Sequence, residues 1–274
     1  MRKFLLASVA ALGFAGTASA ADLAVAPVVY APAFTWTGCY LGINGGWIGS
    51  DESYTSNFDV IGGPRDPAEA ASIVESRNSY GPNDSGGTAG GQFGCQTQLG
   101  SWVIGGEWDW NWSGLKEDNT YVDLFPNQFN QDWYQYTHKE LDWFSTARVK
   151  LGFAWDRFMI YATGGLAYGS FDANTHLDFA DFVPPLFFGG YHEKRFGWTA
   201  GGGLEWAFAN NWTAKAEYLY LDFGSFDYVS VIDLNQVNDP AFVWRTDVDA
   251  KEHVIRVGIN YLFHTGGAPL VARY

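Results

Sequence analysis

Apolar and polar positions alternate along most of the chain after residue 35. Alternation with a period of two is typical of β-strands, whose successive side chains point to opposite faces. Trp108, Trp110 and Trp112 share one face of a segment, whereas Glu107 and Asp109 share the other. The pattern predicts eight strands, over residues 36–47, 86–96, 101–113, 140–154, 157–171, 194–209, 211–223 and 250–263.

The arrangement of these faces predicts a barrel that lives in a membrane. One face is continuously aromatic or aliphatic, with Leu141, Trp143 and Val149 on the segment 140–154, and the opposite face carries charges of both signs. A soluble barrel exposing such a band would aggregate, so the apolar face is expected to meet lipid. We therefore predict an all-β fold, an eight-stranded antiparallel up-and-down transmembrane β-barrel.

The connections between the expected strands alternate between long and short. Short turns are expected near 97–100, 155–156 and 210 on the periplasmic side, and four long extracellular loops over 48–85, 114–139, 172–193 and 222–249. Tryptophans near strand ends predict two aromatic girdles. Trp36, Trp102, Trp155 and Trp212 lie near the short turns, and Trp47, Trp112, Trp143 and Trp198 near the long loops.

The N-terminus has the composition of a secretory signal. Arg2 and Lys3 precede an apolar stretch, and Ala18-Ser19-Ala20 is a small-residue cleavage site. The chain is thus expected to comprise a signal peptide (1–20), a periplasmic linker (21–35), the outer-membrane barrel (36–263) and a C-terminal tail (264–274).

Acidic residues concentrate in the expected loops. The chain has a formal net charge of −14, and the four long segments together hold 21 acidic and 5 basic residues. Such a surface disfavours nucleic-acid binding, which requires accessible Lys and Arg. Membrane lipid and lipopolysaccharide are the expected partners, together with an extracellular ligand that the sequence does not identify.

The inward faces combine four acids and four bases. A lumen of eight strands is just wide enough for side chains to fill, and buried charges must be paired. We expect a salt-bridged plug, with a gated ion path as the alternative. The network comprises Glu107, Asp109, Arg148, Lys150, Glu205, Lys215, Glu217 and Arg256.

Cys39 and Cys95 fall on neighbouring expected strands and on the same outward face. Because an exported protein meets an oxidising compartment, we expect a disulfide between them. Two unrelated thiols are the alternative.

The histidines suggest no catalytic set, and no pair has tight metal-ligand spacing. His138, His176 and His192 fall in expected loops, whereas His253 and His264 flank the last strand. His253 with Asp249 and Glu252 could imitate a hydrolase pair. The aromatic segment 182–188 with His176 or His192 is the one candidate for a haem site, although such loop aromatics are more simply explained as a cap on the barrel. We predict no enzyme activity, no cofactor and no metal.

Several motifs resemble the small outer-membrane β-barrel proteins of alphaproteobacteria, a family related to the OmpA-type transmembrane barrel and to opacity proteins. The motifs are Trp36-Thr37-Gly38, Asp142-Trp143, Arg148-Val149-Lys150-Leu151-Gly152, the segment 161–167, Gly197-Trp198, Lys215-Ala216-Glu217-Tyr218 and the segment 256–263. The resemblance covers residues 21–263 and implies a surface protein with structural, antigenic or adhesive roles. Some members are similar to haemin-binding proteins.

The family also implies a C-terminal assembly signal, for which Tyr261 and Phe263 are the matching residues, read by the barrel assembly machinery. Eleven residues follow Phe263 here, where the family usually ends. The expected function is a non-enzymatic outer-membrane protein that contributes to envelope structure and presents acidic loops. A surface receptor or adhesin for haem or a host component, and a narrow porin-like channel, are the alternatives.

Overall fold

A computed structural model describes residues 34–51, 53–60, 63, 78–80, 84–122, 133–179, 187–232 and 242–264. The expected signal peptide, most of the linker and all but the first residue of the tail lie outside this range, and their limits stay predictions. No helix among the described residues is long and apolar enough to cross a bilayer. The strands are β1 (Gly38–Ser50), β2 (Ser53–Val60), β3 (Asn78–Tyr80), β4 (Ser85–Leu99), β5 (Trp102–Val122), β6 (Trp133–Trp155), β7 (Phe158–Phe179), β8 (Phe187–Trp206), β9 (Trp212–Ile232) and β10 (Phe242–Phe263).

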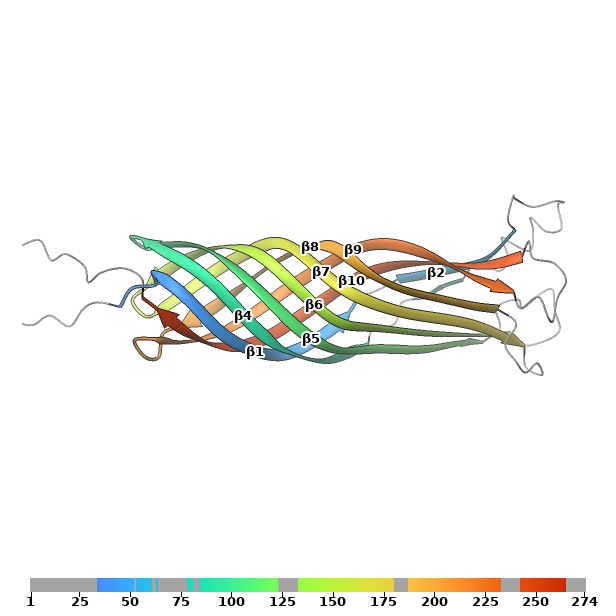
Figure 1. Cartoon of the computed structure of the whole chain (residues 1–274), viewed down its shortest axis with the longest axis horizontal. Coiled ribbons are helices and arrows are strands. Elements are labelled where there is room, and N and C mark those ends of the chain that lie inside the picture. The colour runs from blue at the N-terminus through green and yellow to red at the C-terminus, as the bar shows by residue number, and fades with distance from the viewer. Residues whose placement is uncertain are drawn as a thin grey trace, which may run out of the picture. The chain divides into compact units, whose positions relative to one another are not determined.

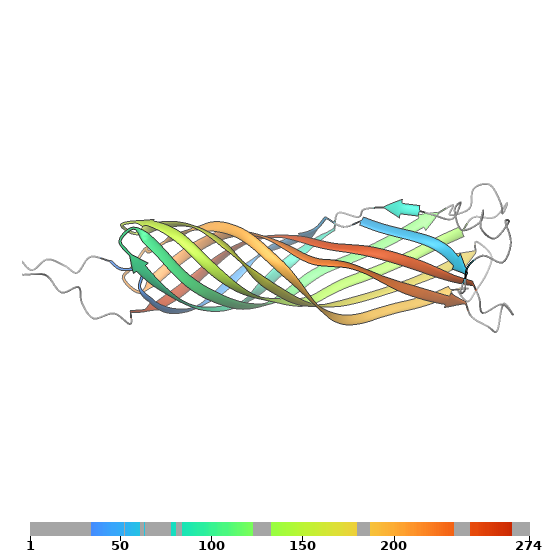
Figure 2. The same cartoon turned by 90° about the horizontal axis from the view of Figure 1, so that it is seen from above.

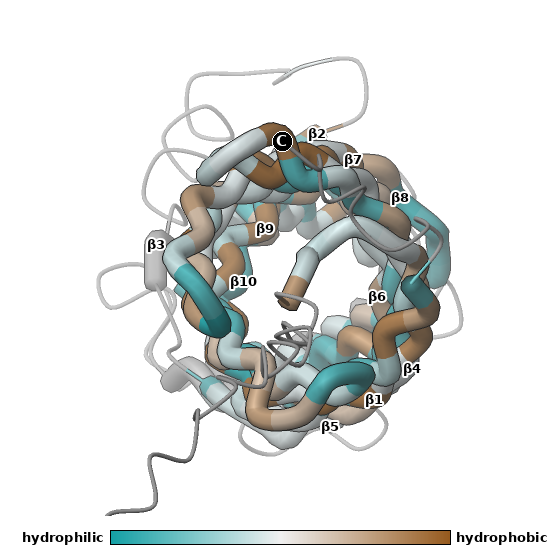
Figure 3. Tube along the Cα trace, turned by 90° about the vertical axis from the view of Figure 1, so that its left-hand side faces the viewer, coloured by the Kyte–Doolittle hydropathy of each residue, from teal (hydrophilic) through white to brown (hydrophobic). Residues whose placement is uncertain are grey.

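Among the residues that the structure describes, eight of the ten strands form a closed antiparallel ring. The order is β1-β4-β5-β6-β7-β8-β9-β10, and β1 also pairs with β10, with Cys39 opposite Phe263 at one end of the ladder and Ser50 opposite Glu252 at the other. Figure 1 shows the strands crossing the wall at a tilt, and Figure 3 shows the ring from one end. The predicted all-β antiparallel barrel is thereby confirmed.

The remaining strands lie in the first long connection. β2 takes over from β1 as the neighbour of β10, pairing Ser53 with Asp249 and Val60 with Phe242. Figure 2 shows β2 beside β10, beyond the end of β1. β3 then pairs with β2. The expectation of one loop over 48–85 was wrong, because part of this segment is strand: β1 and then β2 pair with successive parts of β10.

The other expected loops are also largely strand. β5 continues to Val122 and β6 already begins at Trp133, so only residues 123–132 separate them. The sequence pattern missed this continuation because the outward positions turn polar beyond Trp112, with Lys116 and Asp118 exposed. Inward and outward residues still alternate there, but the outward side chains meet water instead of lipid. They therefore do not form the apolar face by which the other strands were recognised.

The polarity of the lumen also changes near the level of Trp112, but from charged to mainly apolar. Below it, the lumen holds charged side chains and the outer face is apolar. Above it, the lumen holds an apolar cluster together with buried polar side chains such as Lys139 and Glu252. The cluster comprises Ile48, Tyr54, Leu115, Leu141, Phe144, Ala167, Phe171, Ala173, Leu219, Leu221, Phe223, Phe226, Tyr228, Val248, Ala250 and Val254.

We call this upper part the hydrated extension. Ten residues of β5 beyond Trp112 rise roughly 33 Å along the strand, or about 25 Å along the barrel axis at a typical tilt. The barrel is therefore inside-out where lipid surrounds it and of ordinary soluble polarity where water does.

A bulge at the boundary moves Leu141 of β6 from the outer face to the lumen. The β5–β6 register shifts between Trp112 and Leu115, and the β6–β7 register shifts between Leu141 and Trp143. In β6 the inward residues are even-numbered from Phe144 to Lys150 and odd-numbered from Gln135 to Leu141, whereas β5 and β7 keep one inward phase throughout. Leu141, which was expected on the lipid face, is therefore fully buried in the lumen.

The periplasmic ends are tight. Gly100 and Asp156 adopt φ angles of 65° and 52° in the two-residue turns β4–β5 and β6–β7. Trp102 and Trp155 lie exposed beside these turns, and Trp212 lies exposed at the start of β9, as expected for a girdle. Trp36 was wrongly assigned to it, because its side chain is wholly buried.

Candidate functional site

The lumen of the membrane-spanning part holds the eight charged side chains that the alternation singled out. β5 contributes Glu107 and Asp109, β6 Arg148 and Lys150, β8 Glu205, β9 Lys215 and Glu217, and β10 Arg256. Each residue is almost completely buried. Four acids and four bases balance, so no net charge is left in this layer.

Two arginines connect most of the acids. Arg148 donates from Nη1 to Glu217 at 2.9 Å and from Nη2 to Asp109 at 2.9 Å, and it also contacts Glu107. Arg256 donates from Nη2 to Asp109 at 2.8 Å and from Nε to Glu217 at 2.8 Å. Each guanidinium thus bridges strands on different sides of the lumen.

The two lysines complete the layer. Lys215 Nζ lies 2.8 Å from Glu107 Oε1, and Lys150 Nζ lies 3.1 Å from Glu205 Oε2. Lys150 also lies between two aromatic rings, 4.9 Å from the centre of Tyr40 and 4.7 Å from that of Tyr161. Charge pairs and cation–π contacts together compensate for the lost hydration of these groups.

Two tyrosine–glycine–glutamate arrangements support the network. Tyr40 on β1 lies opposite Gly94 on β4, and its hydroxyl donates to Glu107 on β5 at 2.6 Å. Tyr161 on β7 likewise lies opposite Gly203 on β8 and donates to Glu217 on β9 at 3.0 Å. In each case the tyrosine ring lies over the glycine of the neighbouring strand, and its hydroxyl reaches the glutamate on the strand after that. A side chain in place of the glycine would block the ring.

Gly94→Ala should destabilise the barrel by about 1–3 kcal/mol, the usual cost of overpacking. A Cβ at Gly94 would overlap the Tyr40 ring and lie 2.8 Å from the Gly106 carbonyl oxygen. Unfolding in urea, followed by tryptophan fluorescence, measures the change. Gly87→Ala is the control, since nothing lies within 4 Å of a Cβ there. Equal stability of the two variants would contradict the packing role of Tyr40.

A second closure lies at the periplasmic end, and the sequence did not reveal it. Trp36 packs with Val103, Ala154, Met159 and Tyr161 in a buried cluster. Its backbone N–H donates to Gln98 Oε1 at 2.9 Å, and its indole N–H donates to the Asp156 carbonyl at 3.3 Å. The indole therefore fills the lumen below the charge layer.

The hydrated extension contains a further polar group that sequence reasoning missed. Tyr54 donates to Glu117 Oε2 at 2.7 Å, and Lys139 Nζ lies 3.6 Å from Glu252 Oε1 and 5.0 Å from the Phe171 ring centre. Continued alternation in β5 and β10 would have placed Glu117 and Glu252 inside, whereas the bulge in β6 turns Lys139 inward against the alternation of residues 144–150.

Two side chains of the extension have a raised pKa. Burial raises the pKa of the Tyr228 hydroxyl, which stays protonated and able to donate at neutral pH. On the outer wall, the hydrogen bond to Glu140 raises the pKa of Lys116, which stays charged.

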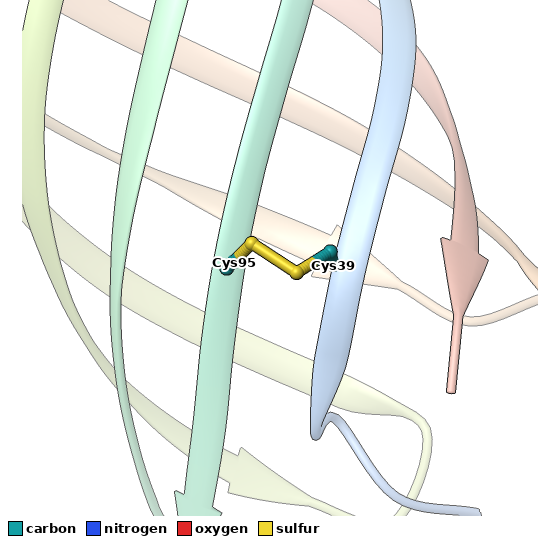
Figure 4. Close-up of a disulfide and its surroundings, with 2 residues drawn as sticks. All are labelled: Cys39 and Cys95. Carbon is teal, nitrogen blue, oxygen red and sulfur yellow. A yellow bond between two sulfur atoms is a disulfide. The ribbon is translucent and has the colours of Figure 1, made fainter. Parts of the chain in front are cut away.

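Cys39 and Cys95 lie opposite each other on β1 and β4 and form a disulfide (Figure 4). Cys39 is also the register partner of Phe263 on β10, so the bond lies beside the strand pair that closes the ring. Both side chains point outward. The described residues contain no other cysteine.

Labelling of the denatured, unreduced protein with a thiol reagent should modify no cysteine, because both sulfur atoms are in the bond. After reduction, two labels per chain should appear in the mass spectrum. Two labels without reduction would contradict the pairing.

The histidines lie apart from the lumen. His138 Nδ1 lies 2.7 Å from Asp118, His192 Nδ1 lies 3.2 Å from Asp172, and His253 Nδ1 lies 2.7 Å from the Tyr218 hydroxyl, all on exposed sides of the wall. His176 stacks on Tyr136 at 4.9 Å. His264 lies 3.3 Å from the Asn211 side-chain amide.

The suggested hydrolase pair is not assembled. His253 lies on the outer side, whereas Glu252 is fully buried in the lumen. Asp249 instead accepts a hydrogen bond from Ser225. In the described part of the chain, no three His, Cys, Asp or Glu side chains are placed to hold a metal ion. Residues 182–186 of the suggested haem site lie outside the described residues.

Tyr261 and Phe263 occupy the last positions of β10 on the lipid side. Their rings contact each other with centroids 4.8 Å apart, and Tyr261 also packs against Trp212 at 5.1 Å. Their role in assembly stays a prediction.

Comparison with known proteins agrees with this architecture. The sequence profile of the outer membrane protein beta-barrel domain matches residues 7–263. The chain is 35% identical to a 31 kDa outer-membrane immunogenic protein of Brucella melitensis, over 96% of this chain and 100% of the relative. It is 29% identical to a 22 kDa outer membrane protein of Rhizobium leguminosarum, over 72% and 69% of the two chains.

Among solved structures, the outer membrane protein OprG from Pseudomonas aeruginosa superposes with a TM-score of 0.45 at 13% identity, covering 84% of this chain and 99% of OprG. Neisserial surface protein A superposes with a TM-score of 0.34 at 10% identity, covering 83% and 98%.

Proposed function

Because this chain belongs to the outer membrane protein β-barrel family and resides in the cell outer membrane, we propose that it is a closed, non-enzymatic barrel that strengthens the envelope and holds its loops away from the membrane surface. The observation that carries the proposal is the filled lumen. Trp36, the charge layer and the apolar cluster occupy it at three successive levels.

The charge layer supports closure better than conduction. An ion path needs groups that can exchange partners with a passing ion at little cost. Here Arg148, Lys215 and Arg256 each contact more than one acid. Displacing one of them would leave several buried charges unpaired.

The hydrated extension supports surface presentation. The described end of β5 lies about 25 Å above the lipid boundary, on the strand geometry given above, and β6 to β10 continue beside it. The Brucella relatives are named as outer-membrane immunogenic proteins, which favours a comparable exposed surface here. We further propose that the barrel assembly machinery inserts the chain by way of Tyr261 and Phe263, and that lipopolysaccharide surrounds it.

Planar bilayer recordings test the closed lumen. The purified full-length protein should give no steady conductance steps, while a general porin reconstituted in the same way shows that channels would be seen. Stable steps whose size scales with the conductivity of the salt solution would replace the proposal with the narrow-channel alternative.

A further inference from the structure

The disulfide faces lipid. Cys39 and Cys95 lie on the outer side of the wall, and the Cys95 side chain is exposed there. The large outward side chains around them are exposed and apolar. They are Leu41 on β1, Phe93 and Leu99 on β4, Ile104 on β5 and Phe263 on β10. The bond therefore belongs to the apolar band of the barrel, where the bilayer surrounds it.

The bond also lies above the periplasmic rim of the barrel. Leu99 and Trp102, which are register partners beside the β4–β5 turn, are both exposed on the lipid side. Cys95 precedes Leu99 by four residues. This distance is about 13 Å along the strand, or about 10 Å along the barrel axis at a typical tilt. The aromatic girdle therefore separates the bond from periplasmic water.

Such a position blocks thiol–disulfide chemistry from the aqueous side. Exchange proceeds by attack of a thiolate on a disulfide sulfur atom, so the attacking group is charged. Hydrocarbon strongly disfavours a charged group. A protein oxidant would also have to bring its own disulfide into the bilayer to reach Cys95. Once β1 and β4 lie in the membrane, aqueous reagents can therefore neither make the bond nor break it.

The bond joins strands that the chain itself keeps apart. Residues 51–84 separate β1 from β4, whereas the other connections between consecutive strands of the described ring have ten residues or fewer. Closing a longer loop costs more chain entropy. A bond already present between Cys39 and Cys95 removes this cost and fixes the β1–β4 register at their position (Figure 4). β1 can then pair on its other side with β10, where Phe263 lies opposite Cys39.

From these features we propose that the bond between Cys39 and Cys95 is made in the periplasm, before β1 and β4 enter the membrane. The two thiols transfer two protons and two electrons to one disulfide of a dithiol oxidant protein, which becomes two thiols. Because the chain has two cysteines, this oxidation has a single intramolecular product and needs no later rearrangement. The oxidised chain, with β1 already tied to β4, is the form that inserts.

A charged phosphine reductant, tris(carboxyethyl)phosphine, tests the isolation of the bond. The full-length oxidised protein is inserted into phosphatidylcholine vesicles, with the reductant on both sides of the bilayer, and heat-modifiable migration on gels verifies insertion. Reduction, counted as alkylated thiols in the mass spectrum, should be at least about tenfold slower than for the same protein in urea, because the charged reagent does not enter hydrocarbon. Reduction at the rate found in urea would overturn the proposal.

The reverse reaction starts from protein that is reduced in urea and inserted with both thiols free. Oxidised glutathione should restore the bond in urea but not in the vesicles. The control Cys39→Ser/Cys95→Ser/Ser101→Cys carries one thiol at the exposed β4–β5 turn, at the same end of the barrel, and it should form a mixed disulfide with glutathione in the same vesicles. Restoration of the bond in inserted protein as fast as in urea would contradict the proposal. If the reduced chain does not insert, the reductant experiment decides.

Pulse labelling in cells tests the order of the two steps. Newly made chains are trapped with N-ethylmaleimide, and the folded, heat-modifiable form should contain the bond from its first appearance. The same phosphine added before the pulse should yield chains without the bond, whereas its addition after folding should leave the bond intact. Folded chains that first appear reduced and then gain the bond during the chase would place oxidation after insertion and refute the proposed order.

Discussion

Arg148→Ala should lower the free energy of unfolding by about 3–5 kcal/mol, the typical cost of removing one partner from a buried ion pair. Arg148 contacts Glu107, Asp109 and Glu217, so its loss leaves negative charge in the lumen with fewer donors. Urea unfolding of the refolded protein in detergent, followed by tryptophan fluorescence, measures the change.

The control removes a cation from an ion pair on the outer wall. Lys116 pairs with Glu140 at 2.8 Å but is well exposed, so Lys116→Ala should change stability little. Adding Asp109→Asn to Arg148→Ala should recover part of the loss, because it removes one of the stranded charges. An Arg148→Ala variant as stable as Lys116→Ala would show that the network is solvated and the lumen open.

Trp36→Ala should cost about 3–5 kcal/mol, as expected when a large buried aromatic side chain leaves a cavity. The indole is wholly buried and also donates to the Asp156 carbonyl, which would lose its partner. The same unfolding measurement applies. Trp108→Ala is the matched control, since Trp108 lies half exposed on the lipid face and its removal leaves no internal void. If Trp108→Ala were the more damaging change, the periplasmic closure by Trp36 would be refuted.

The membrane-spanning part could be read from the sequence because its two faces obey a strict period of two. Glu107 and Arg148 stand out as inward residues since their neighbours on both sides are apolar. The same rule brought Cys39 and Cys95 to one face of adjacent strands. In both cases the inference needed only the strand order of an up-and-down barrel.

Three features escaped the pattern for identifiable physical reasons. Trp36 has the composition and position of a girdle residue, and only the path of the chain at the barrel mouth turns it inward. Leu141 changes face through a bulge, which leaves no signal in hydrophobicity. The hydrated extension was mistaken for loops because water on its outside, instead of lipid, makes its outward residues polar.

The bulge at Phe223 of β9 could not have been anticipated either. Gly224 is one of many glycines in the chain, and its φ of 74° depends on the packing of Phe223 against Phe171. Register is a property of a pair of strands. A single sequence therefore predicts where a strand lies, but not where its pairing with a neighbouring strand shifts by a residue.

The outer wall of the barrel changes from apolar to polar at the outer membrane surface, and spin-label accessibility measures that change directly. Single cysteines are introduced at outward positions, Val149 and Leu151 below the boundary and Lys116 and Asp118 above it, and labelled without reduction so that the native disulfide stays intact. In lipid bilayers, the labels at 149 and 151 should collide with oxygen, and those at 116 and 118 with a water-soluble nickel complex. Labels at 116 and 118 that respond to oxygen as those at 149 and 151 do would place the extension in lipid and contradict the account.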